Sequence, residues 1–147
     1  MKRKEAKQIA HQFIDVLHKI EAGGTGDVDE MVSLFAADAR LTNAALRGRE
    51  FNGPEGARQF WDEYRAAFGD VRSEFSHVIV DGEAAGLFWR TEGRGRDGQP
   101  LAYDGVSLLE WSEKEEGKIS FFRGYYDTRE LARELGVEHR ATAGDQA

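Results

Sequence analysis

The segment that decides the fold is KISFFRGYYDT, residues 118–128, a run rich in aromatic residues that ends at a carboxylate. Its composition predicts a β-strand, followed by a short helix at residues 129–135. A strand this apolar needs a neighbouring strand on each side. Because side chains alternate along a strand, Arg123, Tyr125 and Asp127 are predicted to share one face. We therefore expect a functional site near the carboxyl end of this strand.

Three amphipathic helices are predicted upstream of the strands, at residues 2–22, 27–35 and 54–68. In the first helix, apolar side chains recur at spacings of three and four and form one continuous face. His11 and His18 fall on the opposite face, which predicts contact with solvent rather than a metal site. The helices therefore present apolar faces that a sheet has to cover.

From residue 71 onward the apolar period changes from helical to alternating, which predicts strands. Asp81-Gly82 and Asp97-Gly98 are typical of tight hairpin turns. The predicted strands are residues 38–43, 71–80, 83–94, 99–112 and 118–128. Helices followed by an antiparallel meander indicate the α+β class. We predict a cone-shaped, curved antiparallel sheet wrapped around the three N-terminal helices, in one domain at residues 1–137 with a flexible tail at 138–147.

Composition limits the class of function. The chain has 147 residues and a formal net charge of −7, so it suits one domain and does not suit a nucleic-acid backbone. No apolar run approaches the ~20 residues that span a membrane. There are no cysteines, which excludes disulfides and thiolate metal sites. No apolar segment of a secretion signal follows the charged first residues, and a cytoplasmic location is expected.

The predicted sheet carries aromatic residues on both of its faces. One face packs on the helices, and strong curvature leaves a pocket at the open end of the cone. The outer face then needs another cover, for which a second copy of the chain is the simplest solution. We therefore predict a homodimer formed through the sheet.

Several short motifs occur in an order that matches a known superfamily. They are Gly26–Asp29, Leu34–Ala39, Gly53–Gly56 and Gly117–Asp127. With these motifs the chain resembles the SnoaL-like, polyketide-cyclase-like group of the nuclear transport factor 2-like superfamily, which has a cystatin-like fold, over residues 5–136. The resemblance implies a cone-shaped α+β barrel with an apolar pocket, usually dimeric and without a cofactor. This superfold hosts isomerases, dehydratases, cyclases, epoxide hydrolases and binding modules, so the resemblance does not specify a reaction.

Carrying the family's functional residues over gives a mixed result. The position of the catalytic aspartate in the steroid-isomerase branch holds Asn43, and the position of that branch's oxyanion-binding tyrosine holds Phe13. Both differences argue against the isomerase mechanism. In the cyclase-like branch, the resemblance matches the late acid/base aspartate to Asp127.

Asp127, Arg123 and Tyr125 are the catalytic candidates. At the mouth of an apolar pocket, a carboxylate can take a proton from carbon, while a guanidinium and a phenol can hold a carbonyl or phenolate oxygen. Each of the three also has a structural interpretation, and for Asp127 that interpretation comes first. Asp127 begins a capping box that ends at Glu130, Arg123 can pair with a neighbouring carboxylate such as Asp104, and Tyr125 can simply pack.

A second set of residues is predicted to contact a ligand. These residues are Asn43, Trp61, Tyr64, His77, Trp89, Tyr103 and Asp104. Aromatic residues at these spacings also serve as core, His77 also suits a structural role, and Asp104 also suits a solvated edge.

Two functions agree with this pattern, and neither needs a metal or cofactor. One is a small enzyme of the cyclase, isomerase or dehydratase kind, in which Asp127 abstracts a proton next to a carbonyl of a hydrophobic or aromatic compound. Arg123, Tyr125 or Asn43 would then stabilise the enolate. The other is a non-catalytic dimeric module that binds a small molecule or acts as a scaffold.

Overall fold

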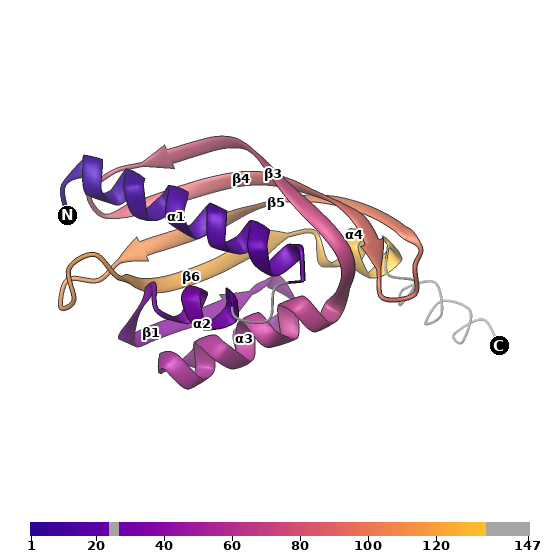
Figure 1. Ribbon diagram of the computed structural model, residues 1–147, viewed down its shortest axis with the longest axis horizontal. Coiled ribbons are helices and arrows are strands. Elements are labelled where there is room, and N and C mark those ends of the chain that lie inside the picture. The colour runs from indigo at the N-terminus through magenta and orange to yellow at the C-terminus, as the bar shows by residue number, and fades with distance from the viewer. Residues whose placement is uncertain (24–26, 135–147) are drawn as a thin grey trace.

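The computed structural model describes residues 1–23 and 27–134, which form helices packed on one curved sheet (Figure 1). The helices are α1 (Arg3–Glu21), α2 (Asp27–Val32), the short η1 (Ala44–Leu46), α3 (Gly53–Ala67) and α4 (Thr128–Glu134). The strands are β1 (Phe35–Asn43), β2 (Phe51–Asn52), β3 (Phe68–Val80), β4 (Ala84–Gly95), β5 (Pro100–Trp111) and β6 (Ile119–Tyr126). The tail predicted at residues 138–147 and the end of the predicted domain lie outside the described residues.

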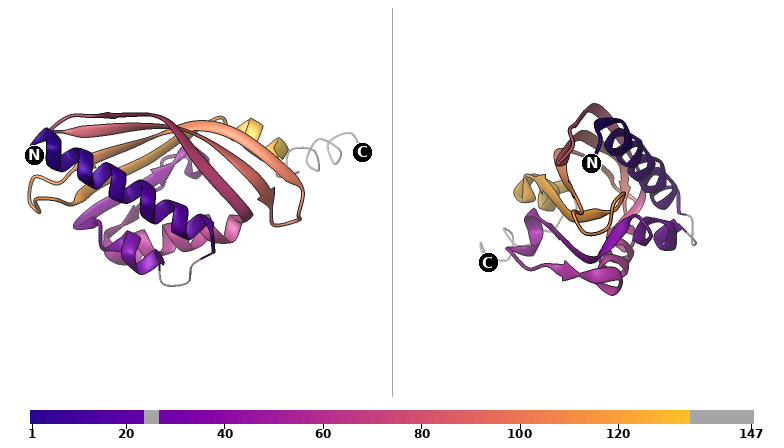
Figure 2. Two further views of the ribbon diagram at one scale, coloured as in Figure 1. Left: turned by 45° about the horizontal axis from the view of Figure 1, so that its top comes forward. Right: turned by 90° about the vertical axis from the view of Figure 1, so that its left-hand side faces the viewer.

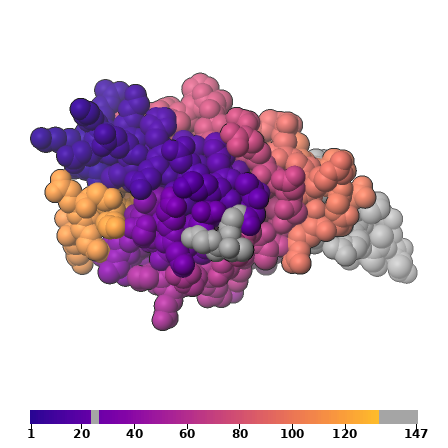
Figure 3. All heavy atoms as spheres, in the orientation of Figure 1, coloured from indigo at the N-terminus to yellow at the C-terminus, as the bar shows by residue number. Residues whose placement is uncertain are grey.

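The six strands form one sheet in the order β2-β1-β6-β5-β4-β3. The sheet curls around the helices without closing, and the predicted α+β class is confirmed (Figure 2). Seen from the helix side, atoms of α1, α2 and α3 cover the centre of the molecule (Figure 3). None of the helices in the described part of the chain is long and apolar enough to cross a membrane.

One detail of the predicted sheet is corrected. The meander of β3, β4, β5 and β6 is antiparallel as predicted, but β1 runs parallel to β6, with Leu41 opposite Phe122. The strand also begins earlier than predicted, at Phe35, a residue that was assigned to the second helix. Just before it, the backbone N–H of Ile119 donates to the carbonyl of Leu34 (2.9 Å). Pairing with a strand more than eighty residues away therefore makes Phe35 part of a strand, although its local pattern is helical.

The decisive segment presents its two faces differently from the prediction. Phe122, Gly124 and Tyr126 point to the concave face and the helices, whereas Arg123 and Tyr125 point outward. The inward positions suit the packing, because Phe122 is 5% exposed and meets a cluster of aromatic rings contributed by α1 and α3. This strand therefore joins the sheet to the helical layer through the face that carries no charge.

The free edge of the sheet is closed by α1. Strand β3 lies at that edge, and the backbone of Ser73 there has no neighbouring strand on one side. Its N–H donates to Glu21 Oε1 (2.8 Å), and its carbonyl oxygen lies 2.7 Å from His18 Nε2. Two side chains one turn apart on α1 therefore replace a missing strand, which blunts an edge open to pairing with other chains.

Trp89 lies on the concave face over a residue without a side chain. Gly105 is paired with Trp89 across β4 and β5 and with Tyr126 across β5 and β6. A Cβ at Gly105 would meet ring atoms of Trp89 and would come within 2.6 Å of the backbone oxygen of Tyr125. The indole can therefore lie against the sheet because position 105 is glycine.

We expect Gly105→Ala to lower the free energy of unfolding by about 2 kcal/mol, because the added methyl overpacks against the indole and the backbone. Chemical denaturation followed by tryptophan fluorescence would measure this change. Gly86→Ala on β4 is the matched control, because the nearest atom to its Cβ is a Phe88 ring carbon at 3.7 Å. Equal denaturation midpoints for the two variants would contradict the close approach at Gly105.

Candidate functional site

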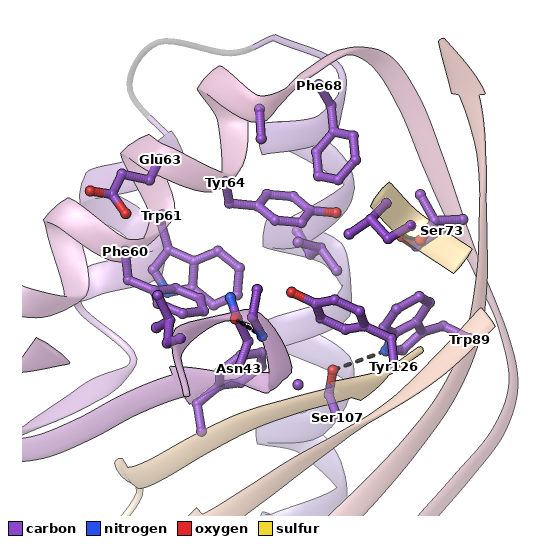
Figure 4. Close-up of a pocket in the computed structure, with 18 of the residues that line it drawn as sticks. Asn43, Phe60, Trp61, Glu63, Tyr64, Phe68, Ser73, Trp89, Ser107 and Tyr126 are labelled. Carbon is purple, nitrogen blue, oxygen red and sulfur yellow. Dashed lines mark hydrogen bonds between the residues drawn. The ribbon is translucent and has the colours of Figure 1, made fainter. Parts of the chain in front are cut away.

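A cavity of about 260 Å³ lies between the helices and the concave face of the sheet (Figure 4). Aromatic side chains form the largest class of its lining, and they come from α1, α3 and five of the strands. Among the described residues, the lining contains no lysine, arginine or histidine, and its one carboxylate is that of the exposed Glu63. The cavity therefore suits a small, uncharged, largely apolar ligand.

One polar group of the cavity is formed where β1 and β6 lead into η1 and α4. The backbone N–H of Ala45 donates to Asn43 Oδ1 (2.9 Å), which fixes the side-chain amide and leaves its N–H groups to serve the cavity. Burial raises the pKa of Tyr126, and a hydrogen bond from the Ala45 backbone partly offsets this effect. The hydroxyl of Tyr126 points into the cavity above Asn43 (Figure 4). This side of the cavity therefore offers hydrogen-bond donors.

A second polar group surrounds a buried carboxylate at the end of α1. Glu21 is 6% exposed, and its Oε2 accepts from Tyr64 Oη (2.7 Å) and from Ser73 Oγ (2.6 Å). Its Oε1 accepts the Ser73 backbone N–H described above. Three donors thus satisfy a charge that lies behind the cavity wall, while Tyr64 and Ser73 themselves line the cavity.

The same network continues across the sheet. Ser73 Oγ lies 2.7 Å from Thr91 Oγ1 on the neighbouring strand. Burial, reinforced by the nearby charge of Glu21, raises the pKa of Tyr64 well above its ordinary value. Burial also raises the pKa of Tyr103, with smaller contributions from Tyr126 and Glu21. These phenols therefore stay protonated and act as neutral hydrogen-bonding groups.

The two tryptophans of the cavity are held differently. Trp89 Nε1–H donates to Ser107 Oγ (2.9 Å) on the neighbouring strand, which fixes the indole plane (Figure 4). Trp61 is held by ring contacts, with its centroid 5.1 Å from that of Phe122 and 4.9 Å from that of Phe60. Its Nε1 is buried and has no hydrogen-bond partner within the described residues.

Most of the predicted ligand-binding residues lie together in this cavity. They are Asn43, Trp61, Tyr64, Trp89 and Tyr103. The expected placement of the other two is corrected. His77 is exposed on the outer face, because a register shift between Phe75 and His77 turns it outward. Asp104 is also outside and exposed, and both of its oxygens accept from Arg90 Nη1 at 3.0 Å.

The three catalytic candidates do not line the cavity, which corrects their expected placement. Asp127 is exposed, and its Oδ1 accepts the backbone N–H groups of Arg129 (2.9 Å) and Glu130 (3.1 Å), so that it caps α4. Arg123 and Tyr125 stack on the outer face, where the guanidinium carbon of Arg123 lies 4.7 Å from the centroid of the Tyr125 ring. Their catalytic role stays a prediction, and their positions give it no support.

Four residues of the site were not predicted. They are Glu21, Ser73, Thr91 and Tyr126. A signal for Glu21 was present, since it follows Leu17 by four positions and Ile14 by seven and so falls on the apolar face of α1. A carboxylate on the buried face of an amphipathic helix needs buried donors and thereby marks a polar site.

We expect the free energy of unfolding to fall as the pH rises above about 10. There the tyrosines of the unfolded chain release their protons, while Tyr64, Tyr103 and Tyr126 in the folded chain keep theirs because their pKa values are raised. The unfolded state then binds fewer protons, so stability declines by up to about 1.4 kcal/mol per pH unit for each such group.

Urea denaturation at a series of alkaline pH values would measure this decline. Tyr103→Phe removes one of the three retained protons and should make the decline shallower. A free energy of unfolding that stays constant or rises over this range would contradict the assignment of these phenols as buried and neutral.

Comparison with known proteins identifies the family of this fold and site. The SnoaL-like domain family matches the chain over residues 11–122. An NTF2-like protein of unknown function from Exiguobacterium sp. 255-15 shares 20% identity with a TM-score of 0.67, over 82% of this chain and 98% of its own. A hypothetical protein with a ketosteroid isomerase-like fold from Catenulispora acidiphila DSM 44928, in complex with trimethylamine, shares 18% identity with a TM-score of 0.70, over 86% of this chain and 93% of its own.

At these identities the two structures show the fold alone, and no curated protein matches the chain. The family match, in contrast, spans most of the sequence, from α1 into the last strand. The protein therefore belongs to the SnoaL-like domain family.

Proposed function

We propose that the protein binds a small, uncharged aromatic or hydrophobic carbonyl compound in the cavity between its helices and its sheet. The observation that carries this proposal is the pair of potential donors, Asn43 and Tyr126, in a lining in which aromatic side chains are the largest class. A carbonyl oxygen is the complement of two converging donors. Aromatic walls contribute area and stacking but little direction, so these donors orient the ligand.

A backbone group holds one member of the donor pair. The N–H of Ala45 donates to Asn43 Oδ1 (2.9 Å), which orients the amide. The N–H groups of Asn43 and the hydroxyl of Tyr126 can then donate to a ligand acceptor. The absence of cationic side chains from the described lining favours a neutral carbonyl over a carboxylate.

A second candidate function is proton-transfer catalysis of the cyclase, isomerase or dehydratase kind. It is favoured by one observation, the buried Glu21 that is hydrogen-bonded to the cavity residue Tyr64. A carboxylate in that place is the natural acceptor for a proton that leaves the ligand, and the donor pair on the other side would stabilise an enolate oxygen.

A cytoplasmic location stays a prediction from the sequence.

Binding of acetophenone and of ethylbenzene tests the proposed function, because the two differ in the carbonyl oxygen. We expect acetophenone to bind more tightly to the wild type, as measured by quenching of tryptophan fluorescence. Tyr126→Phe should reduce that preference about fivefold, since one hydrogen bond to the carbonyl is lost.

Trimethylamine, bound by one structural neighbour, is a comparison probe in the same assay. Equal affinity for acetophenone and ethylbenzene would contradict a carbonyl site. Tighter binding of trimethylamine than of acetophenone would point instead to an aromatic site for a cation.

We also propose that the protein forms a homodimer through the outer face of the sheet. Phe88, Val106 and Tyr125 lie side by side on three adjacent strands there. Phe88 and Tyr125 are each 41% exposed, and Ile79 nearby on β3 is 62% exposed. Arg123 on the same face has a buried Nε without a hydrogen-bond partner among the described residues. Two copies of such a surface can cover each other across a twofold axis.

The mass in solution, measured by light scattering during gel filtration, tests this dimer. We expect about twice the 16.5 kDa of one chain, and we expect Phe88→Glu to return the mass to one chain by placing a charge in the apolar contact. Gln59→Glu on the exposed side of α3 is the control for added charge and should leave the mass unchanged. A wild-type protein with the mass of one chain at micromolar concentration would contradict the proposal.

A further inference from the structure

We infer that Glu21 sets the hydrogen-bonding direction of one wall of the cavity, so that a ligand must present an O–H or N–H donor to that wall. The wall consists of three hydroxyl-bearing residues that line the cavity and are hydrogen-bonded to Glu21 directly or through Ser73, and we call it the Glu21 wall. Its members are Tyr64, Ser73 and Thr91. This inference rests on the proposed function and adds a second requirement, on the side of the cavity away from the carbonyl donors.

The direction starts at the carboxylate. An ionised glutamate accepts hydrogen bonds and donates none. Two hydroxyls therefore donate their single proton to Glu21 Oε2. They are those of Tyr64 (2.7 Å) and Ser73 (2.6 Å). The other oxygen is taken by the Ser73 backbone N–H at 2.8 Å, so the carboxylate is fixed from both sides.

The same direction passes along the sheet. Because Ser73 has used its proton, its Oγ must accept from Thr91 Oγ1, which lies 2.7 Å away. Thr91 has then used its own proton. The three hydroxyl protons of the Glu21 wall therefore point toward one buried charge.

A ligand can use only the lone pairs and protons that this ordering leaves unused. Each hydroxyl of the Glu21 wall retains lone pairs but no free proton, so the wall can accept hydrogen bonds and cannot donate them. On the other side, the amide of Asn43 and the hydroxyl of Tyr126 can donate. The donors lie on β1 and β6, whereas the Glu21 wall lies on α3, β3 and β4. The cavity therefore suits a neutral molecule with an acceptor at one end and a donor at the other.

Four small probes separate the two requirements. Ethylbenzene has neither polar group, acetophenone has the carbonyl, para-hydroxyacetophenone adds a donor, and para-methoxyacetophenone adds an acceptor at the same position. We expect the wild type to bind the hydroxy compound about tenfold more tightly than the methoxy compound, because the methoxy oxygen meets acceptors only. Titration calorimetry or tryptophan fluorescence gives this ratio directly.

Two variants test the role of Glu21. Glu21→Gln keeps the shape but introduces N–H donors, which frees hydroxyl protons of the wall for the cavity, and the hydroxy-to-methoxy preference should fall to about one. Tyr64→Phe removes one acceptor and should reduce that preference while keeping the preference for acetophenone over ethylbenzene. Glu5→Gln, on the exposed face of the same helix, is the matched control and should change neither ratio.

The outcomes distinguish this inference from the proposed function. If acetophenone is preferred over ethylbenzene while the hydroxy and methoxy compounds bind alike, the carbonyl site stands and the inference is overturned. If a folded Glu21→Gln protein keeps the tenfold ratio, Glu21 does not set the direction. If Glu21→Gln fails to fold, Tyr64→Phe decides, and an unchanged ratio in that variant overturns the inference.

Discussion

The hydrogen bonds to the carboxylate of Glu21 are the constraint on which the arrangement of helices, sheet edge and cavity depends. They connect the end of α1 to Tyr64 on α3, 43 residues away, and to Ser73 on β3, 52 residues away. A carboxylate removed from water is strongly unfavourable unless donors surround it. Any arrangement that moved one of these three elements would leave the charge unpaired, so the network selects the register of the elements as well as linking them.

The fold class could be predicted because its signals are local. Helical spacing in three segments before residue 69 and alternation from residue 71 onward identify most of the elements, and two Asp-Gly turns separate strands of the meander. The parallel pairing of β1 with β6 and the early start at Phe35 were beyond reach. Both depend on the bond from the Ile119 N–H to the carbonyl of Leu34, between residues that no local window contains.

The candidate site could be predicted where residue type was enough and could not where orientation decided. Large aromatic residues such as Trp61 and Trp89 reach the cavity from well-identified elements. In the last strand, alternation defines two faces without saying which one is inward. The structure places Phe122 and Tyr126 on the inward face and Arg123 and Tyr125 on the outward one. His77 was misplaced because a single register shift in β3 reverses its side.

An apolar cavity with ordered polar walls discriminates mainly by direction. A ligand that fits by shape but turns an acceptor toward the Glu21 wall leaves buried groups unpaired, at a cost of about 1–3 kcal/mol for each. A missing methylene in such a cavity changes affinity by a similar or smaller amount. Aromatic walls therefore admit many molecules of suitable size, and the two opposed hydrogen-bonding sides decide among them. This selectivity depends on the position of Glu21 behind the cavity wall. Inside the cavity, its carboxylate would have required a cation.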